Sequence, residues 1–157
     1  MTSTEVDYGL KDRVFQAQVG AVVDTILNRA ASGRWGSKGD IRSVVNAPLQ
    51  FSQISGNKGA YGSVQNMPNN HIKRRAEIAV LRHLEARMNG ADSTVGGHLN
   101  YANPYSSSPT SMAWVRPLQI RAQREGLVFG EGRAIHVHGT DPGFARFKPK
   151  PFNIKLM

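Results

Sequence analysis

Two histidines, His136 and His138, alternate in a short apolar segment that predicts a β-strand. Successive side chains of a strand point to opposite faces, so both imidazoles are expected on one face. A His-x-His pair is a common zinc-binding arrangement, to which His98 could add a third ligand and His71 or Asp92 a fourth. A hydrogen-bonded histidine pair without metal is the more usual explanation, and we expect no metal and no cofactor. A zinc-dependent peptidase stays open as the alternative.

The eleven acidic residues are the candidates for general acid–base chemistry. Cleavage of a glycosidic bond requires a carboxylic acid that protonates the leaving oxygen, and hydrolases usually add a second carboxylate. Most acids stand in settings typical of caps, turns, the polar side of a helix or surface ion pairs: Asp12, Asp24, Asp40, Glu77, Glu85, Asp92, Glu125, Glu131 and Asp141. The remaining two acids, Glu5 and Asp7, are the candidates for the general acid, and their local sequence does not favour one over the other.

Hydrophobic periodicity predicts the two main helices that would position these groups. Apolar residues recur at three- and four-residue steps from about residue 12 to 31, with Asp12 as a plausible N-cap, and again from about residue 70 to 88. Residues 40–45 suggest a short helix and residues 50–54 a short strand. On the second main helix, Glu77 and Glu85 are expected to form surface ion pairs with neighbouring arginines such as Arg82 and Arg87.

The second half of the chain predicts short strands and a long loop. Residues 91–113 are rich in Gly, Asn, Ser and Pro and show no helical period. A stretch of this length without secondary structure is usually functional or disordered, and its tyrosines argue against disorder. Residues 127–129 and 134–138 predict a hairpin around Gly130-Glu131-Gly132. Helices followed by strands favour an α+β fold, with residues 1–157 forming one domain.

Composition limits the classes of function. The net charge is +9, with 20 Lys+Arg against 11 Asp+Glu, which favours anionic partners such as peptidoglycan, whose stem peptides carry carboxylates. The basic residues are dispersed and lack interleaved aromatics, so a specific nucleic-acid interface is not expected. No apolar run approaches the length of a membrane span. The absence of cysteine excludes disulfides and thiol nucleophiles.

Four short segments follow one another in a characteristic order: Ile-Leu-Asn-Arg at 26–29, Gln-Phe-Ser at 50–52, Gly-Gly-His-Leu-Asn-Tyr-Ala-Asn-Pro at 96–104, and His-Val-His-Gly-Thr at 136–140. An acidic stretch carrying Glu5 precedes them. In this order they resemble the SleB-like cell wall hydrolases, which cut peptidoglycan glycan strands with one glutamate. The resemblance covers nearly the whole chain and implies a lysozyme-like domain.

The resemblance also implies roles for individual residues. Glu5 would be the general acid and base of a lytic transglycosylase or muramidase acting at the MurNAc-β-1,4-GlcNAc bond. The substrate-binding residues would be Gln50, Ser52, His98, Tyr101, Asn103, Trp114, His136 and His138. For Trp114 alone, simple core packing is an equally good explanation.

Location and partners follow from the same reading. Residues 1–7 show no secretory signal, so an enzyme acting in the periplasm or cell wall would be phage-encoded, virion-associated, released by lysis, or part of a larger protein. Phage tail proteins are then possible partners besides peptidoglycan. A non-catalytic basic virion or wall-binding protein is the third class of function, after the transglycosylase and the zinc-dependent peptidoglycan peptidase that would use His136 and His138.

Overall fold

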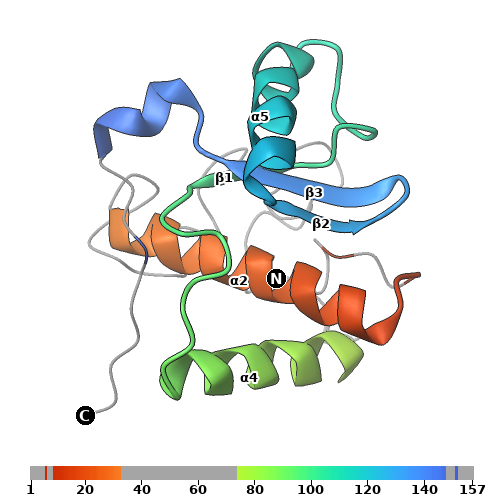
Figure 1. Ribbon diagram of the computed structural model, residues 1–157, viewed down its shortest axis with the longest axis vertical. Coiled ribbons are helices and arrows are strands. Elements are labelled where there is room, and N and C mark those ends of the chain that lie inside the picture. The colour runs from red at the N-terminus through yellow and green to blue at the C-terminus, as the bar shows by residue number, and fades with distance from the viewer. Residues whose placement is uncertain (1–5, 7–8, 33–73, 148–150, 152–157) are drawn as a thin grey trace, which may run out of the picture.

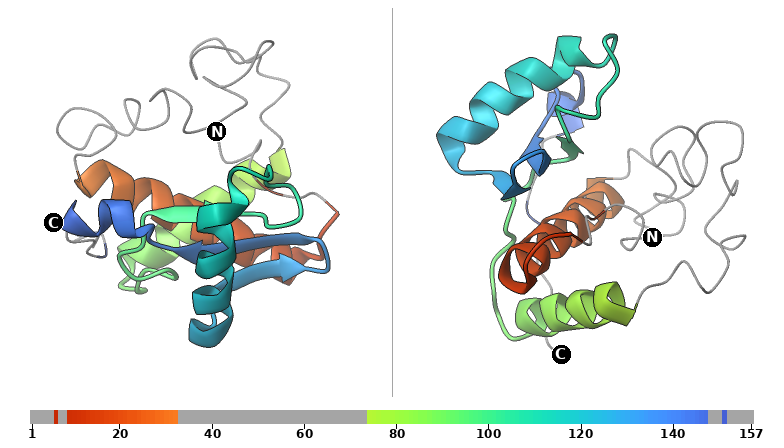
Figure 2. Two further views of the ribbon diagram at one scale, coloured as in Figure 1. Left: turned by 90° about the horizontal axis from the view of Figure 1, so that it is seen from above. Right: turned by 90° about the vertical axis from the view of Figure 1, so that its right-hand side faces the viewer.

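The computed structural model describes residues 6, 9–32, 74–147 and 151. The elements in chain order are α2 (Asp12–Ser32), α4 (Arg74–Met88), β1 (Asn100–Ala102), α5 (Met112–Glu125), β2 (Val128–Glu131), β3 (Ala134–Gly139) and the 3-10 helix η4 (Pro142–Phe147). Figures 1 and 2 show them stacked, with α2 between α4 and a small sheet, and α5 on the other side of that sheet. No described helix is both long and apolar enough to cross a membrane.

Helix α2 is the central element, and nearly its whole circumference is covered. Every residue from Gln18 to Ala30 is buried, including the polar side chains of Gln18, Asp24, Thr25, Asn28 and Arg29. One apolar face packs on α4 in a cluster of Leu10, Phe15, Val19, Val23, Leu27, Ala76 and Ala79. A helix enclosed in this way must satisfy its polar side chains within the protein, because water does not reach them.

Asp24 satisfies this requirement with four hydrogen bonds. Its Oδ1 accepts from His83 Nε2 at 2.9 Å and Arg87 Nε at 3.0 Å, and its Oδ2 accepts from the backbone N–H and hydroxyl of Thr94 at 2.9 and 2.8 Å. Burial alone would raise the pKa of Asp24, but the hydrogen bonds from His83 and Thr94 outweigh it and keep the pKa below its ordinary value. The ionised carboxylate therefore joins α2, α4 and the chain after α4.

The contact between α2 and α4 also depends on Gly20. A Cβ at this position would lie 2.7 Å from His83 Nδ1, too close for any side chain. The absence of that carbon allows the His83 ring to lie against α2 and reach Asp24. On the buried face of α4, two alanines, Ala76 and Ala79, are followed by the two polar partners, His83 and Arg87.

The sheet has the order β1-β3-β2 and is antiparallel throughout. Its register sets Tyr101 opposite His138 and Phe129 opposite His136. One face lies toward α2. The other packs on α5 through a cluster of Leu118, Ala122 and Val137, with Trp114, Leu127, Val128 and Ile135 around it.

The predicted α+β class, the first helix and the hairpin are confirmed. The predicted second helix is observed from residue 74, and the helix predicted at 40–45 and the strand at 50–54 lie outside the described residues. Helix α5 is a third helix that was not predicted. Its interior Pro117, which lacks an N–H, and its short apolar face of Val115, Leu118 and Ala122 conceal the pattern.

Three details of the prediction were wrong. Residues 91–113 contain strand β1, whose partner β3 is distant in sequence. Asp24 and Arg87, expected at the surface, are buried partners of one another. The expected surface ion pairs of Glu77 and Glu85 are not formed within the described part of the chain, where the ion pairs are Arg75–Asp12, His83–Asp24, Arg87–Asp24 and His98–Glu125.

We predict that Asp24→Asn lowers the free energy of unfolding by about 3–5 kcal/mol, because it removes one charge of a buried ion pair between Asp24 and Arg87. Urea unfolding monitored by circular dichroism measures the change. Asp12→Asn is the matched control, since it removes an acid of the same helix whose side chain is 99% exposed, and little change is expected. Similar effects of the two substitutions would contradict the role of Asp24.

Candidate functional site

The face of the sheet turned toward α2 carries a cluster of ring side chains. Tyr101 on β1 stacks on His138 with ring centroids 5.1 Å apart and planes at 19°, and lies 5.0 Å from His136. Phe129 on β2 meets His138 edge-on at 5.2 Å. The ring centroids of His136 and His138 are 6.2 Å apart. The strand alternation expected from the sequence therefore brings His136 and His138 to one face, and β1 adds Tyr101.

Helix α2 lines the opposite side of this cluster with polar groups. Gln18 Nε2 donates to the carbonyls of Phe129 and Ala134 at 3.3 and 3.2 Å, which ties the helix to both strands of the hairpin. Further along the same face, Thr25 Oγ1 lies 3.1 Å from His138 Nδ1. The cluster is thus enclosed between the sheet and the helix, and Tyr101, which is only partly buried, is a member that reaches the surface.

The contacts of Thr25 fix the tautomer of His138. The Thr25 hydroxyl lies 2.9 Å from the carbonyl oxygen of Ala21, which can only accept a hydrogen bond. A hydroxyl has one proton, so Thr25 donates it to Ala21 and accepts from His138. The neutral ring of His138 therefore carries its proton on Nδ1 and a lone pair on Nε2. That Nε2 is buried and has no hydrogen-bond partner among the described residues.

The electrostatics of the cluster keep His138 neutral. Complete burial lowers the pKa of His138 well below its ordinary value, and electrostatic repulsion from His136, Arg29 and His98 acts in the same direction. A neutral, fixed imidazole can accept a hydrogen bond or support the Tyr101 ring. Its tautomer leaves Nε2, rather than Nδ1, as the nitrogen that would bind another group.

The sequence suggested a zinc site formed by His136, His138 and His98. Within residues 9–32 and 74–147, no group of three or more His, Asp or Glu side chains is arranged to hold a metal ion. His98 instead contacts Thr140 Oγ1 through Nδ1 at 2.9 Å and faces Glu125 at 3.6 Å through Nε2. Its pKa is lowered by partial burial, against which Glu125 acts, while Arg121 lowers it further. His71, a suggested fourth ligand, lies outside the described residues.

The Leu-Asn-Arg end of α2 holds the glycine-rich segment in place. Asn28 Nδ2 donates to the carbonyls of Gly96 and His98 at 2.9 and 3.0 Å, and Arg29 Nε donates to the carbonyl of Leu99 at 2.6 Å. Both side chains bind the backbone of a segment that lies 68 to 70 residues away in the sequence. The motif therefore has a structural purpose, which is to position β1 and hence Tyr101.

Asn103 and Trp114 occupy different positions from the ring cluster. Asn103 Nδ2 donates to the carbonyl of Arg133 at 2.9 Å, and its Oδ1 accepts from the N–H of Tyr105. These bonds dock the loop after β1 onto the β2–β3 turn, where Arg133 also lies over the Tyr105 ring. Trp114 packs on the α5 face of the sheet, opposite the histidines.

Three of the predicted site residues, Glu5, Gln50 and Ser52, lie outside the described residues. The next residue after Glu5 is described: Val6 is partly buried and packs against the cluster between α2 and α4. Sequence reasoning missed Gln18 and Thr25. Their spacing was a signal in the sequence, because residues 18, 25 and 29 recur at seven- and four-residue steps and so lie on one face of the helix, together with the apolar Val22.

One comparison with known proteins identifies the family. A family model described as Cell Wall Hydrolase matches residues 15–127, which is most of the chain. The chain therefore belongs to the cell wall hydrolase family. The matched span includes most of α2 and all of α4, β1 and α5. It also includes six of the predicted site residues, which are Gln50, Ser52, His98, Tyr101, Asn103 and Trp114, whereas Glu5 and the two β3 histidines lie outside it. No curated protein and no solved structure matches the chain.

We predict that His138 makes the protein less stable as the pH falls. An unfolded histidine takes up a proton near pH 6.5, whereas folded His138, with its lowered pKa, does not. The unfolded state then binds more protons, so the free energy of unfolding falls below about pH 6.5, by up to about 1.4 kcal/mol per pH unit. Above that pH the two states bind protons equally and the contribution is constant.

Urea unfolding at a series of pH values between 5 and 8 measures this dependence. His138→Gln should flatten it, and His98→Gln should flatten it less, because His98 is only partly buried. Asp24 does not interfere, since its lowered pKa confines its own contribution to pH values below about 3.8. An unchanged slope in His138→Gln would show that His138 is protonated in the folded state.

Proposed function

We propose that this cell wall hydrolase cleaves the glycan strands of peptidoglycan at the MurNAc-β-1,4-GlcNAc bond, as a lytic transglycosylase with Glu5 as general acid and base. The observation that carries the proposal is the match to the cell wall hydrolase family over residues 15–127, which supports peptidoglycan as the substrate. The bond cleaved and the residue that cleaves it are our inference.

Neither Asp24 nor the exposed acids of the described residues suit the role of general acid, which supports a catalytic acid outside the described residues. Asp24 already accepts four hydrogen bonds and is held ionised, so it cannot deliver a proton. The exposed acids, such as Glu77 and Glu131, lack the apolar surroundings that a catalytic acid needs. Val6, the next residue after Glu5 in the chain, is described and packs on the core at α2.

A single carboxyl group is sufficient for the proposed reaction. Glu5 gives its proton to the glycosidic oxygen as the bond from C1 of MurNAc to that oxygen breaks. The 6-hydroxyl of the same MurNAc then attacks C1, and the Glu5 carboxylate takes the hydroxyl proton. The products are a strand ending in 1,6-anhydro-MurNAc and a free GlcNAc 4-hydroxyl, and the enzyme is returned to its starting state.

The ring cluster fits the role of a sugar platform. Sugar faces stack on aromatic rings, and Tyr101 offers a partly exposed ring supported from behind by His138. We propose that Tyr101 contacts sugar directly, with His136, His138 and Asn103 positioning it, and with Gln50, Ser52 and His98 binding polar groups of the strand. Trp114, on the opposite face of the sheet, is better placed to support the fold.

The setting of the reaction is the cell wall, as the family implies. A phage lysin or virion-borne enzyme is one such setting, and phage tail proteins would then be partners.

We predict that the purified protein releases muropeptides ending in 1,6-anhydro-MurNAc from peptidoglycan, as detected by mass spectrometry. Chelators should leave the activity intact. Products ending in reducing MurNAc would instead identify a hydrolase that uses water. Newly freed amines without glycan cleavage would identify a peptidase and overturn the proposal.

We predict that Glu5→Gln lowers turnover by about 10²–10⁴-fold, since the amide keeps the shape of the side chain but has no proton to give. The melting temperature should change little. Asp7→Asn is the matched control and should keep activity. Full activity in Glu5→Gln would sink the assignment, and loss of activity in Asp7→Asn alone would transfer the role to Asp7.

A further inference from the structure

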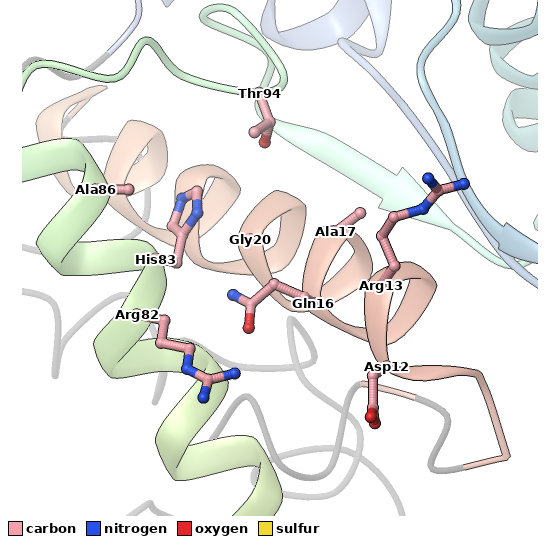
Figure 3. Close-up of a pocket in the computed structure, with 9 residues that line it drawn as sticks. All are labelled: Asp12, Arg13, Gln16, Ala17, Gly20, Arg82, His83, Ala86 and Thr94. Carbon is pink, nitrogen blue, oxygen red and sulfur yellow. The ribbon is translucent and has the colours of Figure 1, made fainter.

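A groove of about 530 Å³ runs between α2 and α4, on the side of α2 away from the sheet. Its lining comes from the two helices and the chain after α4, as Figure 3 shows: Asp12, Arg13, Gln16, Ala17, Gly20, Arg82, His83, Ala86 and Thr94. Three of these, Ala17, Gly20 and Ala86, have little or no side chain. The groove therefore exists because small residues line the two helices where they approach.

The polar groups of the groove can take part in binding. His83 reaches from α4 toward α2 beside Gly20. Its Nε2 donates to the ionised Asp24, so a neutral ring has an accepting Nδ1, and this atom has no hydrogen-bond partner among the described residues. Gln16 Nε2 donates to the carbonyl of Ala79 at 2.9 Å. That bond fixes the amide and leaves Gln16 Oε1 as an acceptor.

The charges of the groove favour an anionic ligand. Arg13 on α2 and Arg82 on α4 are exposed, and neither forms an ion pair within the described part of the chain. In the view of Figure 3, Gln16 lies between them. The one exposed acid of the lining, Asp12, is already paired with Arg75 at 3.0 Å. The lining is thus positive, with acceptors between the two arginines.

The lining also indicates which kind of anion fits. It contains no Phe, Tyr or Trp, and its one imidazole, His83, is buried against Gly20. A sugar face or a nucleic-acid base therefore has no exposed ring on which to stack. An acidic peptide needs no such ring, because arginine binds its carboxylates and acceptors such as Gln16 Oε1 receive its backbone N–H groups. Peptidoglycan carries such peptides on every muramyl residue that keeps its stem.

We propose that the groove between α2 and α4 binds the carboxylate-bearing stem peptide of peptidoglycan. The inference rests on the proposed function for its substrate, and it adds a second recognition site to the glycan site. The groove holds the peptide while the sheet side of α2 holds the glycan strand. Binding at the groove then raises the affinity for peptide-bearing strands and leaves the rate of the chemical step unchanged.

Kinetics on two substrates test the proposal: intact glycan strands, and strands whose stem peptides have been removed by an amidase. The wild-type protein should show the lower KM on intact strands. Arg13→Gln with Arg82→Gln should raise that KM by roughly three- to tenfold, the effect of losing two solvent-exposed ion pairs. The same double variant should leave kcat, and the KM for stripped strands, unchanged.

The matched control is Arg116→Gln with Arg124→Gln, which removes the same charge from the exposed face of α5. It should not change the preference for intact strands. An equal rise in KM in both double variants would show that the effect comes from net charge alone and would overturn the proposal. Equal KM values of the wild-type protein on the two substrates would overturn it as well.

A binding measurement separates this inference from the proposed function. Free stem peptide, titrated into the full chain, should shift the NMR signals of the His83 ring in the wild-type protein and not in the Arg13→Gln, Arg82→Gln variant. Peptide binding without any glycan cleavage would refute the proposed function and support the groove. Glycan cleavage without any shift of the His83 signals would refute the groove alone.

Discussion

The carboxylate of Asp24 is the constraint on which the rest of the structure depends. It lies in the interior of the protein and carries a charge, so every lone pair requires a donor, and His83, Arg87 and Thr94 supply them. These donors come from α4 and from the chain after it. Because the carboxylate cannot be left unpaired, the distance between the two helices and the start of the glycine-rich segment are fixed together. Gly20 is the steric counterpart of this arrangement.

The other polar residues of α2 extend the same principle toward the sheet. Gln18 binds carbonyls of the hairpin, Thr25 binds His138, and Asn28 and Arg29 bind the backbone that leads into β1. A three-stranded sheet with strands of three to six residues has little stability of its own. The polar face of α2 compensates by holding each strand separately, which is why the rings of Tyr101, His136 and His138 meet.

Local patterns were enough to predict part of this fold. The period of α2 and the alternation at His136 and His138 are local, and they predicted the central helix and one face of the hairpin. Long-range partners were not accessible in the same way. The pairing of β1 with β3 and the burial of Asp24 with Arg87 depend on residues about 40 and 63 positions apart. Polar residues such as Asp24 and Arg87 were assigned to the surface because buried charges are uncommon. Their burial is tolerable because they pair with one another and because His83 and Thr94 also donate hydrogen bonds to Asp24.

The family motifs illustrate the difference between recognising a residue and explaining it. The Leu-Asn-Arg sequence contributed to the resemblance, yet its action is to bind the backbone of residues 96–99. The substrate contacts are instead expected at Tyr101 on β1, which the Leu-Asn-Arg motif positions. On this view α2 separates two recognition sites, the partly exposed ring of Tyr101 on the sheet, which is suited to sugar, and an arginine-lined groove suited to peptide. A substrate made of glycan strands with attached peptides presents both chemistries at once, so a helix that is buried on nearly all sides is a suitable divider between them.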